Sequence, residues 1–143
     1  MEIESLRRLS SSDVYRWVTT CDENFCSPRW SEERLSEYVL KLSKNAYFDL
    51  LFDNGNKVGF VAYYLNEKNK FAYITMIAVA KEFRGKGYSK ILLDSFLSHL
   101  SLGIDYVSLE VSKFNISALC LYKKYCFVEV EERGEKIMMK KTL

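Results

Sequence analysis

The sequence has few of the residues from which metal centres and nucleophilic catalytic groups are built. Its 143 residues include one histidine, His99, and four cysteines, none of them in C-x-x-C spacing. A Ser-His or Cys-His pair would have to use His99, which comes near the end of a predicted helix, where a structural role is sufficient. We therefore expect no metal site, and we expect the cysteines to be free thiols in a reducing cytoplasm.

Long apolar runs and a strong charge of one sign are also missing. No uninterrupted apolar stretch approaches the ~20 residues of a membrane span, and the N-terminus lacks the apolar core of a signal peptide. The formal net charge is +2, from 21 Lys and Arg against 19 Asp and Glu, and it is too dispersed for a nucleic-acid surface. We expect a cytoplasmic protein with no nucleic-acid or membrane partner. The oligomeric state is not readable, and a homodimer is one option.

Composition and periodicity predict one α/β domain over residues 1–143. Apolar residues make up 48% of the chain and charged residues 28%, which is typical of a globular protein with a real core. The pattern predicts a mixed, mostly antiparallel sheet with about four helices, in the order β-α-α-β-β-β-α-β-α-β-β. We expect strands at 3–9, 47–52, 57–65, 71–80, 106–111, 127–130 and 136–140. We expect helices after Ser10–Asp13, after Ser31, from Tyr88 to Leu102 and over 117–125.

The most informative stretch is 71–93, where a buried strand, a glycine turn and a helix follow one another. The turn reads Arg84-Gly85-Lys86-Gly87, and the helical pattern begins at Tyr88. The first N–H groups of a helix lack carbonyl partners, and the helix dipole places partial positive charge there. Glycine also lets another molecule approach the backbone closely. This combination predicts a phosphate-binding site.

Three phosphate-binding patterns compete for this turn. A Walker loop fails because residue 80 is alanine and residue 87 is glycine, and a dinucleotide fingerprint fails because the third glycine is missing. The third pattern is [QR]-x-x-G-x-[GA], the pyrophosphate loop of the GCN5-related N-acetyltransferase (GNAT) family, and residues 84–89 resemble it with Ser89 in the last place. Taken alone, the six residues fit a simple basic turn equally well.

A second motif makes the resemblance specific. The segment 109–127 is similar to the L-x-V-x-x-x-N-x-x-A-x-x-L-Y-x-x-x-G-F segment of the same family, with Cys126 in place of the glycine. Its Leu109-Glu110-Val111 is most similar to the bacterial ribosomal-protein-alanine N-acetyltransferase branch. The resemblance covers most of the chain from residue 45 onward, while the first forty-odd residues match only in pattern. The substitution at Cys126 implies a turn that is strained or made differently.

The resemblance implies an acetyl-CoA-dependent N-acetyltransferase in which an amine attacks the thioester directly in a ternary complex, with acetyl-CoA as co-substrate and no metal. The end of the strand at 71–80 would pair its main chain with the pantetheine arm, and the glycine turn would hold the pyrophosphate. Asn115 would bond the pantetheine, although capping of the following helix explains it equally well. The implied cofactor-binding residues are Ile77, Ala78, Val79, Arg84, Gly85, Lys86, Gly87, Tyr88, Ser89 and Asn115.

The resemblance also implies two catalytic side chains. Tyr122 is the candidate acid, because a phenol is protonated at neutral pH and can donate a proton to the leaving sulfur. Glu110 is the candidate base, since desolvation in an apolar strand could make its carboxylate a stronger base. A packing tyrosine and a solvated glutamate are the simpler interpretations, and a water chain could replace the base. Some relatives carry the base on the strand before the loop, where this chain has Tyr73 and Thr75.

The acceptor is the least determined part. By resemblance it enters between residues 21–30 and 131–136, whose acidic bias suits a cationic amine. The branch similarity favours a peptide N-terminus, while small amines, polyamines, aminoglycosides and amino-sugar nucleotides stay open. A non-catalytic CoA-binding or sensor domain is the main alternative function. A nucleotide-binding protein that uses the glycine turn for ATP or NAD is a third.

Overall fold

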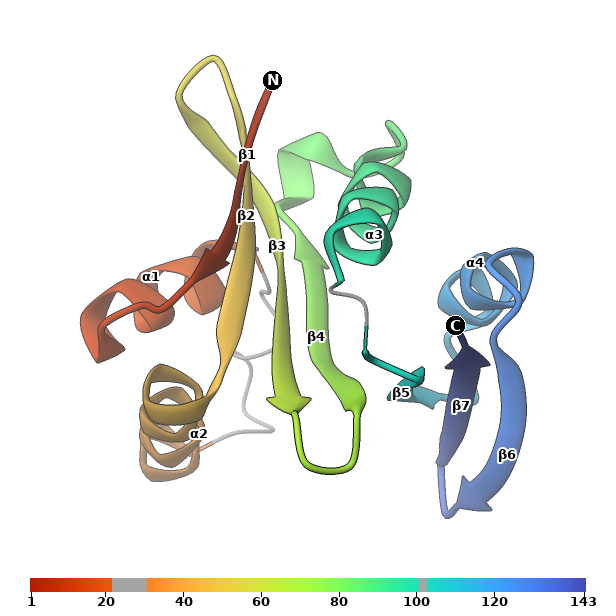
Figure 1. The fold of residues 1–143 in the computed structure, drawn as a ribbon. Coiled ribbons are helices and arrows are strands. Elements are labelled where there is room, and N and C mark those ends of the chain that lie inside the picture. The colour runs from red at the N-terminus through yellow and green to blue at the C-terminus, as the bar shows by residue number, and fades with distance from the viewer. Residues whose placement is uncertain (22–30, 101–102) are drawn as a thin grey trace. The chain divides into compact units, whose positions relative to one another are not determined.

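The computed structural model describes residues 1–21, 31–100 and 103–143. The strands are β1 (Glu2–Arg7), β2 (Tyr47–Asp53), β3 (Asn56–Asn66), β4 (Phe71–Val79), β5 (Tyr106–Ser112), β6 (Val128–Arg133) and β7 (Lys136–Thr142) (Figure 1). The α-helices are α1 (Ser11–Cys21), α2 (Glu32–Asn45), α3 (Tyr88–His99) and α4 (Ile116–Lys124), and a 3₁₀ turn at Lys81–Phe83 precedes α3. This is the predicted order of elements.

The seven strands form one sheet in the order β1-β2-β3-β4-β5-β7-β6. The ladders β1–β2, β2–β3, β5–β7 and β6–β7 are antiparallel, and the β4–β5 ladder is parallel. The predicted mixed, mostly antiparallel α/β fold is therefore confirmed. The largest differences in boundaries are that β6 extends to Arg133 instead of Val130 and that α3 ends at His99, before the predicted Leu102. Residues 101–102 lie outside the described part.

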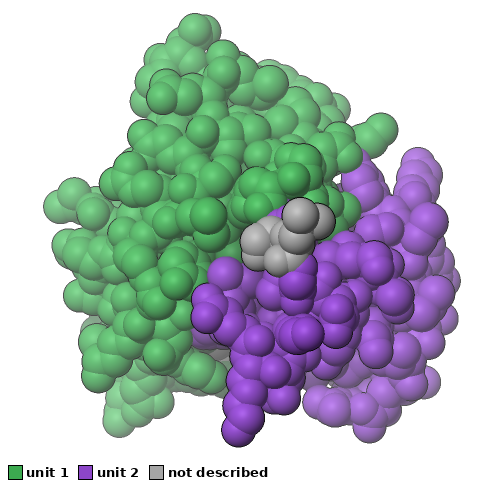
Figure 2. Space-filling view, in the orientation of Figure 1, with its two compact units in different colours: residues 1–63, 76–99 green, residues 64–75, 100–143 purple. Residues whose placement is uncertain are grey.

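Contacts divide the chain into two compact units, which Figure 2 colours separately. Unit 1 comprises residues 1–63 and 76–99, and unit 2 comprises residues 64–75 and 100–143. Strands β3 and β4 each contribute residues to both units. The assignment of residues 1–143 to a single domain stays a prediction. In the described ranges, no helix has the length and apolarity needed to cross a membrane.

Strand alternation decides which helices cover each face of unit 1. On one face, Trp17 of α1 meets Phe52 and Phe60 edge-on, with ring centroids 5.3 and 6.1 Å apart. On the other face, Phe96 of α3 meets Tyr63 of β3, with centroids 4.8 Å apart. Figure 1 shows α1 and α2 on one side of β1–β3 and α3 on the other. Both faces of these strands are thus buried, which explains why β2 and β3 read as nearly continuous apolar runs.

Gly59 of β3 allows a close approach beneath α3. A Cβ at this position would lie 2.4 Å from the carbonyl oxygen of Ala78 and 3.2 Å from a methyl group of Leu92. The first of these distances is shorter than real Cβ contacts, so any side chain would push β4 away from β3. The glycine therefore fixes the position of the last residues of β4 within unit 1.

In unit 2, α4 covers one face of β5 and β7. The side chains of Val107, Leu109 and Met139 are buried on this face. Lys141, which is paired with Val107, donates from Nζ to the carbonyl oxygen of Tyr125 at the end of α4, at 2.8 Å. Because side chains alternate along a strand, Glu110 points to the opposite face, away from α4.

The turn after α4 is made by a residue in the left-handed conformation. Cys126 has φ +68°, its N–H donates to the carbonyl of Lys123 at 3.0 Å, and the N–H of Phe127 donates to that of Tyr122 at 3.0 Å. This is the way a helix ordinarily ends at glycine. The sequence interpretation left two options for Cys126, and the structure has the strained one: the usual turn, made without glycine.

Candidate functional site

The predicted phosphate loop has the backbone geometry that such a site needs. Gly85 and Gly87 have φ +77° and +85°, and no atom lies within 4 Å of a Cβ built on either of them. The carbonyl of Gly87 accepts the first bond of α3 from Ile91 at 3.3 Å. The N–H groups of the first turn, which starts at Tyr88, therefore have no acceptor inside the helix. The described residues form an open backbone surface at a helix N-terminus, which fits a pyrophosphate.

The side chain of Arg84 makes two contacts within unit 1. Its Nε donates to the carbonyl of Val79 at 2.9 Å, and its Nη2 donates to the carbonyl of Cys21 at 3.1 Å. Cys21 is the last residue of α1, so the guanidinium lies at the negative end of that helix. Arg84 thus ties the end of β4 to α1. Arg84 and Lys86 are both exposed and place positive charge beside the turn.

Tyr88 is held by a partner that the sequence did not reveal. Its hydroxyl donates to Oδ2 of Asp53 at 2.8 Å, and this hydrogen bond raises the pKa of the phenol. Asp53 is the last residue of β2. Its carboxylate anchors the first residue of α3, so the orientation of the helix N-terminus is fixed by a contact across unit 1.

The end of β4 carries the predicted pantetheine-binding residues. Ala78 and Val79 are buried, and Ile77 is half-buried. The ladder with β5 pairs Phe71–Ile74 with Tyr106–Leu109, so residues 75–79 of β4 lie beyond it. The side chains of Ala78 and Val79 pack in the core, which leaves their main chain as the part that a cofactor could use.

Two predicted site residues lie on α4 or at its start, in unit 2. Asn115 is the N-cap: its Oδ1 accepts from the N–H of Ala118 at 3.1 Å. Tyr122 is half-buried and packs against Phe127, with ring centroids 5.7 Å apart. Burial raises the pKa of Tyr122 to about 12. Its phenol is therefore protonated at neutral pH, as an acid must be.

The side chain of Glu110 is 32% exposed and lies near the end of β5. The sequence predicts a lone glutamate in an apolar strand, but the structure gives it a partner: Nη1 of Arg133 lies 3.5 Å from its Oε1. Since Glu110 faces away from α4, the structure does not bring it beside Tyr122 within unit 2. Proton acceptance and donation by these two side chains would take place on opposite faces of β5.

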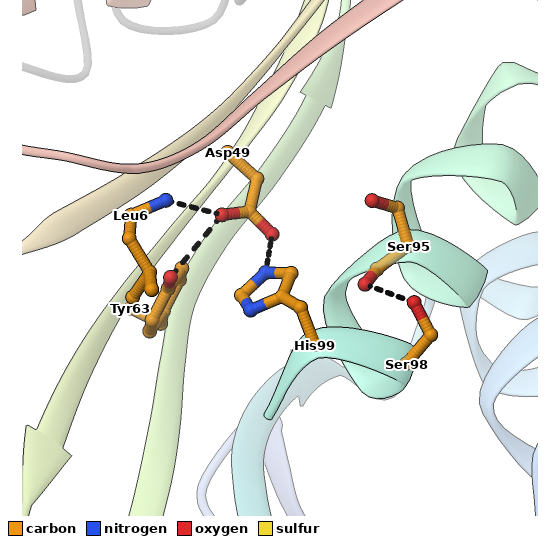
Figure 3. Close-up of polar contacts among 6 residues, drawn as sticks. All are labelled: Leu6, Asp49, Tyr63, Ser95, Ser98 and His99. Atoms are coloured by element: carbon orange, nitrogen blue, oxygen red, sulfur yellow. Dashed lines mark hydrogen bonds and ion pairs between the residues drawn. The ribbon is translucent and has the colours of Figure 1, made fainter. Parts of the chain in front are cut away.

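A buried polar cluster in unit 1 was missed by the sequence analysis (Figure 3). Asp49 of β2 is fully buried and accepts from the hydroxyl of Tyr63 at 3.1 Å and from the N–H of Leu6 at 3.2 Å. Its second oxygen is paired with Nε2 of His99 at the end of α3. The available signal was a single carboxylate inside the apolar run YFDLLF. This contact gives His99 a structural role.

The acceptor-binding prediction lies partly outside the described residues, which exclude 22–30. The other predicted segment is the β6–β7 hairpin, in which Glu131, Glu132 and Glu135 are exposed. In the described ranges, no group of three His, Cys, Asp or Glu side chains is placed to hold a metal ion.

Comparison with known proteins places this geometry in a family. The family model described as "Acetyltransferase (GNAT) family" matches residues 11–126. Among curated proteins, a probable spermine N(1)-acetyltransferase of Bacillus subtilis subsp. natto is 30% identical in an alignment of 101 positions that covers 63% of this chain and 66% of that protein. The match thus spans slightly less than two thirds of this relative.

Several solved structures share the fold over almost the whole chain. A Pyrococcus horikoshii protein is 25% identical, with a TM-score of 0.80, and covers 99% of this chain and 98% of its own. The PaiA N-acetyltransferase of Thermoplasma acidophilum, solved with coenzyme A, is 20% identical over 100% of both chains, with a TM-score of 0.71. The ribosomal-protein-S18-alanine N-acetyltransferase of Escherichia coli is 22% identical, with a TM-score of 0.76, and the match covers 99% of this chain and 92% of that protein. The branch that the sequence favoured is one neighbour among several and is not singled out.

Proposed function

The chain belongs to the acetyltransferase (GNAT) family, and we propose that it transfers the acetyl group of acetyl-CoA to a primary amine. The observation that carries this proposal is the turn before α3. Gly85 and Gly87 adopt left-handed angles with open space beside them, and the helix behind them presents its N-terminus. A diphosphate needs such a backbone surface, and a plain basic turn would not require it.

Cofactor binding is assigned mainly to the main chain. Residues 77–79 would pair with the amides of the pantetheine arm, and residues 84–89 would hold the pyrophosphate with backbone N–H groups and Lys86. Asn115 keeps its capping role and is assigned to the same arm. When bound, acetyl-CoA supplies the acetyl group as a thioester. The coenzyme A complex of a structural neighbour supports this choice of cofactor.

Glu110 and Tyr122 are assigned separate proton transfers, one from each face of β5: Glu110 acts on the attacking amine and Tyr122 on the leaving sulfur. Glu110 accepts a proton from the attacking amine, which leaves the nitrogen lone pair free to form the new C–N bond. Tyr122 donates its proton to the sulfur as the C–S bond breaks, and the raised pKa of the phenol ensures that this proton is present. The products are an acetylated amine and the free thiol of CoA.

A cationic acceptor suits the exposed charges of unit 2. The β6–β7 hairpin carries several exposed carboxylates, which attract ammonium groups and repel anions. The name of the Bacillus relative points to a polyamine, while the Leu109-Glu110-Val111 motif points to a peptide N-terminus. We propose a primary amine with further positive charge, for which spermidine and an alanine-initiated basic peptide are the first acceptors to test.

The deciding experiment incubates the protein with acetyl-CoA and an amine panel and follows thiol release, with mass spectrometry of the products. The panel contains spermine, spermidine, N-terminal peptides and an aminoglycoside. We expect thiol release only when an amine is present and one added acetyl group per thiol released. Binding of CoA without transfer to any amine would contradict the enzyme assignment. It would favour the non-catalytic alternative, with which the existing ion pair of Glu110 is consistent.

A further inference from the structure

Arg133, the last residue of β6, links two carboxylates of unit 2. Its Nε and Nη2 lie 3.0 and 2.9 Å from Oε2 of Glu131, and its Nη1 lies 3.5 Å from Oε1 of Glu110. The contact with Glu131 is short and uses two nitrogens, whereas the contact with Glu110 is longer and uses one. Arg133 is therefore held mainly by Glu131 and presents its remaining nitrogen to Glu110.

The strand register explains why these three side chains meet. Glu110 of β5 is paired with Met138 of β7, and Met138 is paired with Glu131 of β6. Residues in one row of a sheet point to the same face, so both carboxylates lie on the face away from α4. Glu110 and Glu131 are two strand spacings apart, about 10 Å, and the long side chain of Arg133 spans this distance.

Few other charged or titratable groups face Glu110. On β7 the nearest rows carry Lys136, paired with Ser112, and Lys140, paired with Ser108. On β4 the residue paired with Ser108 is Tyr73. The pKa of Arg133 is raised, mainly by its hydrogen bond with Glu131 and to a smaller extent by Tyr73. In the part of the chain that the structure describes, Arg133 is the cation in ion-pair contact with Glu110.

We propose that Arg133 is a positioning residue for Glu110, holding its carboxylate toward the β6–β7 hairpin, the side from which the cationic acceptor is proposed to enter, so that it meets the proton of the acceptor amine. This inference rests on the proposed function, because it takes Glu110 as the proton acceptor. An exposed glutamate on its own samples several rotamers. A guanidinium already fixed by Glu131 restricts the glutamate at little further entropic cost, because the arginine has lost its own freedom in the first contact.

The same hairpin offers a matched control. Lys113 Nζ lies 3.3 Å from Oε1 of Glu132, so this second exposed ion pair also joins the β6–β7 hairpin to the segment that follows β5. It does not touch Glu110. Replacing Lys113 removes a surface ion pair of the same kind, and a general effect on the hairpin would appear in both variants.

The first test needs no substrate. The side-chain rotamers of Glu110 are followed by NMR, through the three-bond couplings of its β-protons, in the full chain and in Arg133→Gln, Arg133→Lys and Lys113→Gln. A carboxylate held by an arginine keeps one rotamer, whereas an unpaired surface glutamate averages over several. We expect one dominant rotamer in the wild type and in Lys113→Gln, and averaged couplings in Arg133→Gln, with Arg133→Lys between them. Unchanged couplings in Arg133→Gln overturn the inference, because Arg133 would then not hold the carboxylate in solution.

The second test measures the acetylation rate with the amine that the panel identifies. The readout is kcat at one neutral pH, and it reports whether the carboxylate of Glu110 is correctly oriented. We expect Arg133→Gln to lower kcat about two- to fivefold, the range for an exposed ion pair, with the KM for acetyl-CoA unchanged. In a Glu110→Gln background the same substitution should have no effect. A wild-type kcat in Arg133→Gln overturns only this inference, whereas a wild type that acetylates no amine overturns the proposed function with it.

Discussion

At the scale of single residues, Tyr122 has the clearest chemical signature. Its phenol has a pKa raised to about 12 by burial, so it keeps its proton through the whole pH range in which enzymes are assayed. We predict that Tyr122→Phe lowers kcat by about 10²-fold, a usual loss for a general acid, without changing the affinity for CoA. Steady-state kinetics and CoA titration check this.

Tyr106→Phe is the control for that substitution. Tyr106 stacks on Phe71 with ring centroids 5.1 Å apart, and phenylalanine keeps the stack. Wild-type turnover in Tyr122→Phe would show that Tyr122 only packs against Phe127. A loss of wild-type activity between pH 8 and 10 that Tyr122→Phe does not share would contradict the raised pKa of Tyr122 and not its role, because the phenol would then lose its proton in that range.

His99 and Asp49 give a prediction about stability and pH. The hydrogen bond to Asp49 raises the pKa of His99, although burial opposes it. A raised folded-state pKa adds stability that is complete below the unfolded value of about 6.5 and is lost as the pH rises through the folded value. We predict that His99→Leu costs about 1–3 kcal/mol at pH 6 and less at pH 9, as measured by urea unfolding.

The neighbouring Ser98 supplies the control. Its hydroxyl donates to the carbonyl of Ser95 at 2.8 Å (Figure 3), and it is exposed at the same end of α3. Ser98→Ala should change stability by a similar small amount at both pH values. If His99→Leu were equally costly at pH 6 and pH 9, the ionic part of the contact with Asp49 would be refuted.

The sequence predicted only those parts of the candidate site that belong to local motifs. The glycine turn and Tyr122 were found because their signals lie within a few positions in the sequence. The partner of Glu110 is 23 positions away, and the pair forms only once β7 lies between β5 and β6. The contact of Arg84 with the end of α1 is likewise set by tertiary packing. Pairings of this kind depend on register, which a single sequence does not encode in any local pattern.

At the scale of elements, the end of α4 is the most informative place. Cys126 holds φ +68°, a conformation that costs a residue with a side chain roughly 1–2 kcal/mol and costs glycine nothing comparable. We predict that Cys126→Gly stabilises the protein by about 1 kcal/mol, because part of the gain is lost to the freer unfolded chain. Thermal unfolding measures the change.

Two alanine variants separate the backbone effect from the loss of a thiol. Cys126→Ala keeps the strain of the left-handed backbone angle and should leave the midpoint of thermal unfolding nearly unchanged. Cys120→Ala removes the other exposed thiol of α4 and should not reproduce the gain. Equal stabilisation by Cys126→Ala and Cys126→Gly would mean that the thiol, and not the backbone angle, is unfavourable.

The elements themselves were predictable because each has its own period. Leu35, Val39 and Leu42 are buried along α2 as their spacing indicates, and the Asn54-Gly55 turn joins β2 to β3 as expected. The residues at which helices and strands end were less predictable. The strand was predicted to end at Val130, yet residues 131–133 continue β6, because pairing with β7 outweighs the low strand propensity of charged residues.

At the scale of the whole molecule, cofactor choice can be tested without catalysis. A ligand that binds only the folded chain stabilises it by about 2.7 kcal/mol at 100 times its Kd. We predict that CoA raises the unfolding temperature in this way, whereas ATP and NAD at the same concentration do not. Thermal unfolding with each ligand makes the comparison. Equal stabilisation by ATP would favour the nucleotide-binding alternative.

Two matched glycine variants test whether the stabilisation by CoA arises at the turn before α3. Gly87→Ala places a side chain beside the open turn, and Gly134→Ala does the same in the β6–β7 turn, where φ is also positive and the space is also open. Both substitutions carry a similar backbone strain, so their stabilities without ligand should fall alike. Only Gly87→Ala should lose the response to CoA. A full response in Gly87→Ala would remove the phosphate loop from the binding site.

The ladder between β4 and β5 has a consequence for biosynthesis. Phe71–Ile74 pairs with Tyr106–Leu109, a segment that leaves the ribosome only after all of α3 has been made. At about 5–20 residues per second, the nascent chain exposes an unpaired, apolar strand edge for a few seconds. During that interval the edge is open to capture by another chain. Chaperone demand during translation should therefore depend on how quickly residues 80–105 are synthesised.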